Sequence, residues 1–130
     1  MCSSDLVAIT PLQLRNGLNA SGSAPIYACR AWVNFNGTGT VAIRASGNVS
    51  SITDNGTGDY TVNFTTAMPD ANYSLCGITQ EDTSGGSSGI TALTMQRSTA
   101  AFSTGSARVL TTNNSGVVVD RVAVAVNVFR

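Results

Sequence analysis

Apolar and polar residues alternate with a period of two along most of this chain from residue 26 onward. In residues 27–35, Val33 and Phe35 would face one way while Trp32 and Asn34 face the other. This alternation is typical of half-buried β-strands, because successive side chains of a strand point to opposite faces of its sheet. The same criterion predicts about eight strands, at residues 27–35, 41–45, 49–53, 60–64, 73–79, 90–96, 107–112 and 117–129.

Turn-forming residues separate these strands. Asn36-Gly37-Thr38-Gly39 ends the first strand, and Asp54-Asn55-Gly56-Thr57-Gly58-Asp59 joins the third to the fourth. Both segments are rich in the residues that hairpin turns require. Many antiparallel strands and almost no helix predict an all-β chain, folded as an antiparallel, jelly-roll-like β-sandwich.

A short helix is predicted ahead of the strands. Thr10 can cap it, Pro11 suits its first position and Gly17 can end it. So short a helix is not stable alone in water, so it must dock on the domain or on a partner chain. The polar residues 19–25 form a linker. We therefore predict an N-terminal attachment segment, residues 1–25, and a β-sandwich domain, residues 26–130.

The last predicted strand, residues 117–129, is apolar on both faces. A sandwich strand with one solvated face should carry polar residues there, but this one is interrupted only by Arg121 and Asn127. The second face is therefore covered, either by loops of the same chain or by another subunit. The second alternative predicts a subunit interface at Val117, Val119, Ala123, Ala125 and Phe129.

The charge and the apolar content of the chain argue against nucleic acid and membranes as partners. The 130 residues contain seven arginines, seven acidic residues, no lysine and no histidine, so the net charge is zero. This length fits one domain, and the chain lacks the basic surface that binds nucleic acid. No apolar run is long enough to span a membrane, and no basic segment with an apolar core begins the chain as a signal peptide would. We expect neither membrane insertion nor export by that route.

The three cysteines, Cys2, Cys29 and Cys76, are widely spaced. Without a CxxC pair or a histidine they predict no metal site. They are expected to be reduced and mostly packed thiols. A disulfide between Cys29 and Cys76 is the alternative, if their strands are neighbours.

Catalytic motifs are weak in this sequence. Residues 85–89, GGSSG, match the GxSxG nucleophile motif formally, but no histidine is present to activate Ser87. Asp54 and Asp59 flank a turn and could approach each other as a glycosidase pair or, with Asn55, as Ca²⁺ ligands. Hairpin chemistry explains them as well, because Asp and Asn accept backbone hydrogen bonds in turns. We expect no enzymatic activity, no cofactor and no bound metal.

Residues 29–42, CRAWVNFNGTGTVA, and residues 54–64, DNGTGDYTVNF, carry a family resemblance. The block from residue 29 to residue 73 resembles the C-terminal β-domain of tail-fibre and related virion proteins of tailed bacteriophages, and residues 117–130 resemble it less closely. The resemblance implies a homotrimer in the virion, assembled in the cytoplasm of the host bacterium and joined to other virion proteins by its N-terminal segment.

Three function classes are consistent with this resemblance. The first is the receptor-binding tip of a tail fibre, which would attach to a bacterial surface polysaccharide. The second is a structural protein of the capsid surface, such as a head fibre or decoration protein, without receptor binding. The third, an endoglycanase, is the least favoured.

The resemblance supplies no binding residues, so the ligand-binding candidates come from chemistry alone. Trp32 could stack on a sugar ring or on a neighbouring subunit, or it could be buried under a loop. Glu81, Asp82, Ser87 and Ser88 lie in a Ser- and Gly-rich segment and could bind glycan hydroxyls. Otherwise that segment is a solvated connector.

Overall fold

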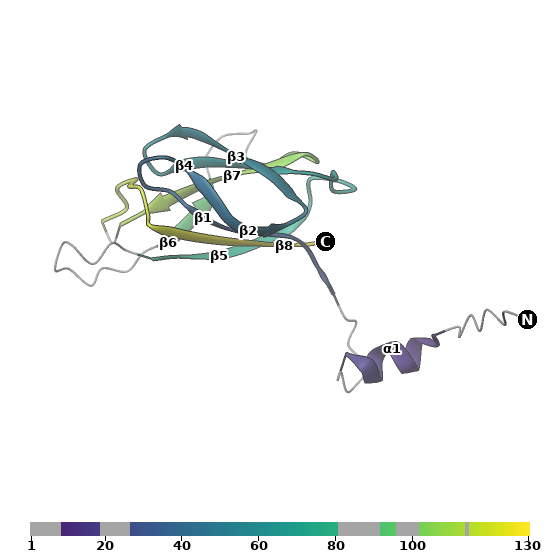
Figure 1. The fold of residues 1–130 in the computed structure, drawn as a ribbon. Coiled ribbons are helices and arrows are strands. Elements are labelled where there is room, and N and C mark those ends of the chain that lie inside the picture. The colour runs from purple at the N-terminus through teal and green to yellow at the C-terminus, as the bar shows by residue number, and fades with distance from the viewer. Residues whose placement is uncertain (1–8, 19–26, 81–91, 96–101, 114) are drawn as a thin grey trace, which may run out of the picture.

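Two four-stranded antiparallel sheets pack face to face in this protein (Figure 1). A computed structural model describes residues 9–18, 27–80, 92–95, 102–113 and 115–130. Sheet A has the strand order β2-β1-β8-β5, and sheet B has the order β3-β4-β7-β6. The predicted all-β antiparallel sandwich is confirmed. The strands are β1 (Cys29–Asn36), β2 (Ala42–Gly47), β3 (Val49–Gly56), β4 (Asp59–Phe64), β5 (Ser74–Gln80), β6 (Ala92–Met95), β7 (Ser106–Thr112) and β8 (Ala123–Phe129).

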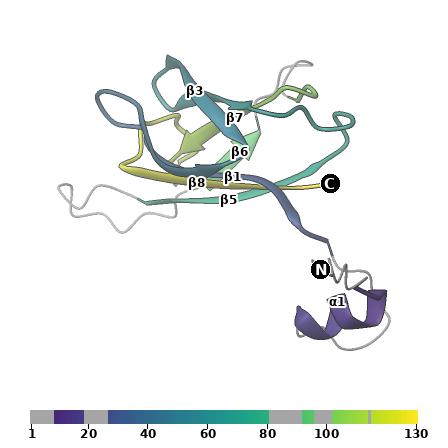
Figure 2. The ribbon, with the colours of Figure 1, turned by 45° about the vertical axis from the view of Figure 1, so that its right-hand side comes forward.

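The core lies between the two layers, which Figure 2 shows from the side. The rings of Phe35 from sheet A and Tyr60 from sheet B meet edge to face, with their centroids 5.1 Å apart. Each fully buried side chain of valine size or larger stabilises the fold by roughly 1.5–3 kcal/mol. Strand alternation predicts the inward positions of Val33, Phe35, Val124, Val126 and Val128 correctly, and Tyr60, Val62 and Val109 are buried with them.

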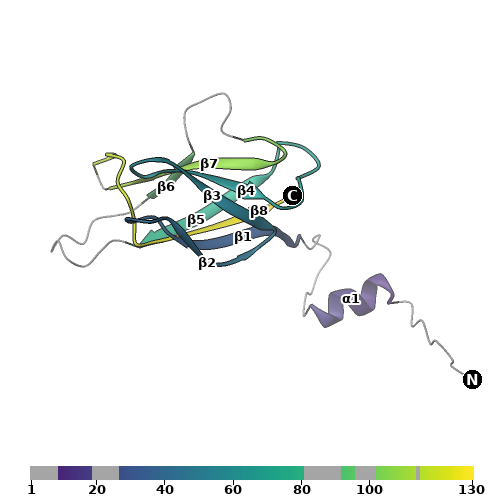
Figure 3. The ribbon, with the colours of Figure 1, turned by 45° about the horizontal axis from the view of Figure 1, so that its top comes forward.

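The predicted strand 117–129 is wrong in its first half. Val119 donates its backbone N–H to the carbonyl of Thr111 at 3.0 Å, and Val118 forms an isolated bridge with Thr112. Residues 117–119 therefore run along the end of β7, in sheet B. Only residues 123–129 form β8, which lies between β1 and β5 in sheet A (Figure 3).

The chain crosses from sheet B to sheet A at residues 120–122, and polar contacts hold it there. The Asp120 carboxylate accepts a hydrogen bond from the backbone N–H of Gly58 at 2.6 Å and one from the Tyr60 hydroxyl at 2.9 Å. Arg121 is buried and donates to the carbonyl of Thr112 at 3.0 Å. Arg121 is therefore part of the structure's interior, whereas the sequence pattern had placed it on an outer strand face.

The predicted helix is present as α1 (Pro11–Gly17). Its N-cap Thr10 accepts from the backbone N–H of Gln13 at 3.2 Å, and the Gln13 side chain accepts from the N–H of Thr10 at 2.8 Å. This reciprocal capping satisfies two backbone donors at the helix start. The helix buries none of its residues, so its leucines remain available for contact with another chain.

Cys29 and Cys76 are both exposed free thiols, so the expectation that they are packed is wrong. They lie on β1 and β5, which β8 separates. Two strand spacings are about 9.5 Å, whereas disulfide-bonded residues have Cα atoms about 4.4–6.8 Å apart. The geometry therefore excludes the alternative of a Cys29–Cys76 disulfide within one chain.

Candidate functional site

The outer face of sheet B is a network of polar side chains that satisfy one another. Arg108 donates to both carboxylate oxygens of Asp59, at 2.8 and 2.6 Å. The Asn63 amide donates to the hydroxyls of Ser51 at 3.0 Å and Thr53 at 2.9 Å. These cross-strand pairs are what a solvated sheet face requires. On β3, β4 and β7, these side chains therefore pair with one another.

The two aspartates considered for catalysis or Ca²⁺ binding have structural partners in this network. Asp54 accepts from the backbone N–H of Gly56 at 2.9 Å, which is hairpin-turn chemistry. Hydrogen bonds from Arg108 lower the pKa of Asp59 below its usual range, although partial burial opposes the shift. A carboxylate held ionised in this way is a poor general acid. In the described part of the chain, no three metal-ligating side chains cluster.

Sheet A presents a different outer surface. Cross-strand pairing places Trp32 opposite Asn127 and Asn127 opposite Cys76, and in the next row Asn34, Ala125 and Ile78 lie side by side. Trp32 is 43% exposed and Ile78 is 75% exposed. None of the outward residues in these rows is acidic or basic. We call this surface the outer face of sheet A; it comprises Trp32, Asn34, Ser74, Cys76, Ile78, Gln80, Ala123, Ala125, Asn127 and Phe129.

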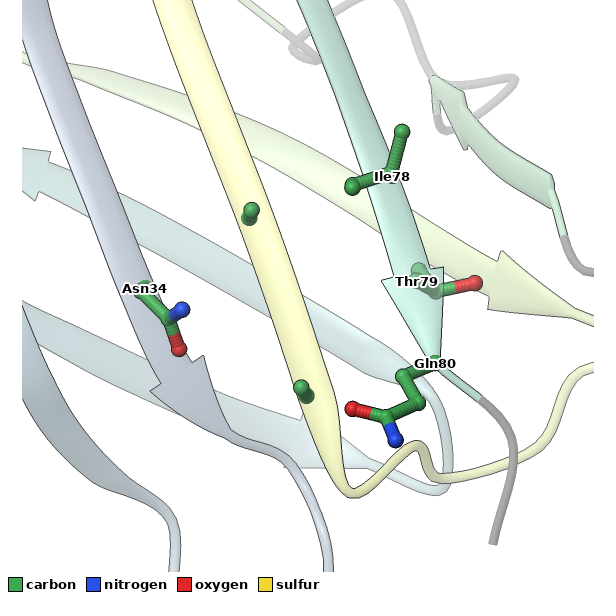
Figure 4. A pocket seen from close by; sticks show the side chains of 6 residues that line it. Asn34, Ile78, Thr79 and Gln80 are labelled. Atoms are coloured by element: carbon green, nitrogen blue, oxygen red, sulfur yellow. The ribbon is translucent and has the colours of Figure 1, made fainter.

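A hollow of about 170 Å³ lies on this face, over β8 and between β1 and β5 (Figure 4). Ala123 and Ala125 form its floor, because their methyl groups are shorter than the side chains on both flanking strands. Asn34 stands on one side, and Ile78 and Gln80 stand on the other. Thr79 completes the lining. The hollow therefore combines two side-chain amides with aliphatic surface.

Arg44 of the edge strand β2 holds the Asn34 amide in place. Its guanidinium donates to Oδ1 of Asn34 at 3.3 Å, to the carbonyl of Phe35 at 3.3 Å and to the carbonyl of Val122 at 2.5 Å. With Oδ1 already accepting, Asn34 presents its Nδ2 group as the donor for a ligand. Arg44 is not part of the lining, so it contacts the hollow only through its hydrogen bond to Asn34.

Trp32 lies across the edge strand beside the hollow. A Cβ atom built on Gly47 would be 2.4 Å from Nε1 of the indole, so only glycine leaves room for the ring there. The indole covers the glycine of the paired strand and is not covered by a loop itself. The expectation of burial under a loop is therefore wrong, and one ring face is accessible on the outer face of sheet A.

The structure brings together residues that the sequence assigned to different sites. Ala123, Ala125 and Phe129, predicted as subunit contacts, share the outer face of sheet A with Trp32, a predicted ligand-binding residue. Val117 and Val119 lie apart from them, beside the end of β7. Glu81, Asp82, Ser87 and Ser88 lie outside the described residues.

The sequence analysis missed Asn34, Ile78 and Gln80 as site residues. Alternation along β1 does place Asn34 on the same side as Trp32, so that residue could have been found. Nothing in the local pattern shows that β5 lies on the other side of β8.

In the described part of the chain, no helix has the length and apolar character needed to cross a membrane. Comparison of the chain with protein-family models, with curated proteins and with solved structures finds no match.

Proposed function

We propose that this chain is a structural protein of a bacteriophage virion, the receptor-binding tip of a tail fibre that attaches to a surface glycan of the host bacterium. The resemblance that motivates this proposal covers residues 29–73, which include β1 to β4. The observation that carries it is the outer face of sheet A. That face joins an accessible indole, side-chain amides and an alanine-floored hollow, and none of the ten residues that define it is acidic or basic.

These features suit a glycan better than other partners. Aromatic rings pack on the C–H faces of sugars, and amides both donate to and accept from hydroxyl groups. A nucleic acid would require a basic surface, which this face lacks. A shallow site of this kind binds weakly, with a dissociation constant of roughly micromolar to millimolar. Several copies acting together would supply the avidity that attachment needs.

We further propose that the tip is a homotrimer joined to the rest of the virion through residues 1–25. In the described part of this segment, Leu12 is 66% exposed, and Leu14 and Leu18 are each 55% exposed. Contacts between copies at α1 would stabilise a helix that is too short to persist alone. They would also leave the outer face of sheet A open to the host glycan. In this role the protein needs no cofactor and catalyses no reaction.

The alternative is a capsid-surface protein, such as a head fibre or decoration protein, in which another subunit covers the outer face of sheet A. The small residues Ala123 and Ala125 and the protruding Ile78 favour this alternative, because they allow close packing of a second sheet. Ala123, Ala125 and Phe129, which the sequence analysis predicted as contacts of the homotrimer, would then lie in the interface with that subunit.

Two measurements on the phage test the proposed function. Labelling with antibody fragments against the sandwich domain should mark the end of the tail fibre in electron micrographs. The same fragments should reduce adsorption to host cells, whereas fragments against the capsid should not. Labelling on the capsid surface together with normal adsorption would replace the tip with the alternative.

A further inference from the structure

We propose that the hollow on the outer face of sheet A is a subsite for one uncharged sugar ring. This inference rests on the proposed function and assigns a ligand class and a position to it. The hollow is lined by Asn34, Ile78, Thr79, Gln80, Ala123 and Ala125.

The size of the hollow limits its occupant to a small ring. Pockets for drug-sized ligands occupy about 300–1,000 Å³, whereas this hollow measures about 170 Å³. The floor consists of methyl groups from alternate residues of one strand, Ala123 and Ala125. The C–H face of a pyranose ring can lie on such a floor, while the hydroxyl groups at the ring's edge reach the flanking strands.

The lining matches the edge groups of a sugar. The Nδ2 group of Asn34 supplies donors on the β1 side, while its Oδ1 accepts from Arg44. The Gln80 amide offers both a donor and an acceptor on the β5 side. Sugar hydroxyls donate and accept hydrogen bonds, so they can pair with both amides. The aliphatic side chain of Ile78 would contact the C–H groups between them.

The charge of the lining selects an uncharged sugar. None of the six lining residues is acidic or basic. An ionised ligand group placed in the hollow would lose hydration without gaining a counter-ion there. The Arg44 guanidinium lies outside the lining, where it donates to the oxygen atoms of Asn34, Phe35 and Val122. We therefore expect a neutral hexose or N-acetylhexosamine to bind in preference to a uronic acid.

Nuclear magnetic resonance titration of the full chain tests this assignment. D-glucose, D-galactose, N-acetyl-D-glucosamine and D-glucuronic acid would be added separately to the ¹⁵N-labelled protein. At least one neutral sugar should shift the side-chain amide signals of Asn34 and Gln80 in a saturable way, with a dissociation constant on the order of millimolar. Glucuronic acid should bind more weakly than that sugar.

Two alanine-to-leucine variants give a matched comparison. Ala125→Leu fills the hollow and should weaken binding by about tenfold or more. Ala42→Leu adds the same side chain at an exposed position that is also on sheet A, opposite Asn36 and outside the lining, and it should leave binding unchanged. If Ala125→Leu fails to fold, Gln80→Ala removes one amide at an exposed position and should also weaken binding.

Three results would overturn the sugar subsite: no shift with any neutral sugar, equal loss in both leucine variants, or tighter binding of glucuronic acid. A change in the number of copies in Ala125→Leu, measured by light scattering, would assign the hollow to a subunit contact instead. If the sugars fail while antibody fragments still block adsorption, the receptor-binding function stands and only the subsite is wrong. If the protein is on the capsid yet binds sugar at Asn34 and Gln80, the function is wrong and the subsite stands.

Discussion

At the scale of single residues, the contact between Trp32 and Gly47 determines where the indole lies on the outer face of sheet A. Trp32 is the only tryptophan in the chain, so its fluorescence reports on this contact alone. We expect Gly47→Ala to displace the indole, because the new Cβ would lie 2.4 Å from Nε1. The emission should shift to longer wavelength, and stability should fall by about 1 kcal/mol. Gly105→Ala is the control, since a Cβ there meets nothing within 4 Å. Equal emission spectra for the two variants would contradict the close packing of Trp32 on Gly47.

The buried hydroxyl of Tyr73 should make the stability of the protein fall at alkaline pH. Burial raises the pKa of its hydroxyl to about 12, above the value near 10 that tyrosine has in unfolded chains. The folded state therefore favours the neutral hydroxyl. Stability should be unaffected by this group below pH 10 and should fall as pH rises from about 10 to 12. Urea unfolding across this range should show a shallower fall for Tyr73→Phe, whereas Tyr27→Phe, at a residue 71% exposed, should match the unaltered protein.

At the scale of elements, the turn between β3 and β4 supports the segment that leads into β8. Gly58 and Gly39 share a φ of 61°, a conformation that costs other residues roughly 1–2 kcal/mol. A Cβ on Gly58 would also lie 2.6 Å from the carbonyl oxygen of Val119, whereas one on Gly39 would meet nothing within 4 Å. Gly58→Ala should therefore destabilise the protein by about 1–3 kcal/mol more than Gly39→Ala. Equal losses in urea unfolding would mean that residues 118–119 do not rest on this turn.

At the scale of the whole molecule, the assembly prediction separates the two proposed functions. Light scattering after size exclusion should report three times the chain mass of 13.3 kDa. If the copies meet at α1, exchanging Leu14 and Leu18 together for glutamine should give monomers. These leucines are four residues apart, on one side of the helix, and both are 55% exposed. Glutamine has nearly the helix propensity of leucine, so the helix itself should tolerate the change.

Ala125→Arg provides the opposite test. In the tip the trimer should persist, because the outer face of sheet A is open. In a capsid-surface protein the trimer should dissociate, because an unpaired charge buried between subunits costs several kcal/mol. A monomeric unaltered protein at micromolar concentration would contradict the homotrimer in either function.

The sequence by itself determined most of the local structure. Period-two alternation identified the inward residues of β1 and β8, and the Thr10, Pro11 and Gly17 signals defined α1. These features depend on neighbours within a few residues, which the sequence displays directly. The outward position of Asn34 followed from the same alternation, so one side of the hollow was predictable.

Only the tertiary structure decided which distant strands become neighbours. The hollow exists because β8 lies between β1 and β5, and this also keeps Cys29 from Cys76. Periodicity continued through residues 117–129, yet the chain crosses between sheets at Asp120 and Arg121, where hydrogen bonds to Gly58, Tyr60 and Thr112 hold it. Strand order depends on how whole faces pack against each other. Local alternation is the same whichever neighbours a strand acquires, so it could not reveal this site.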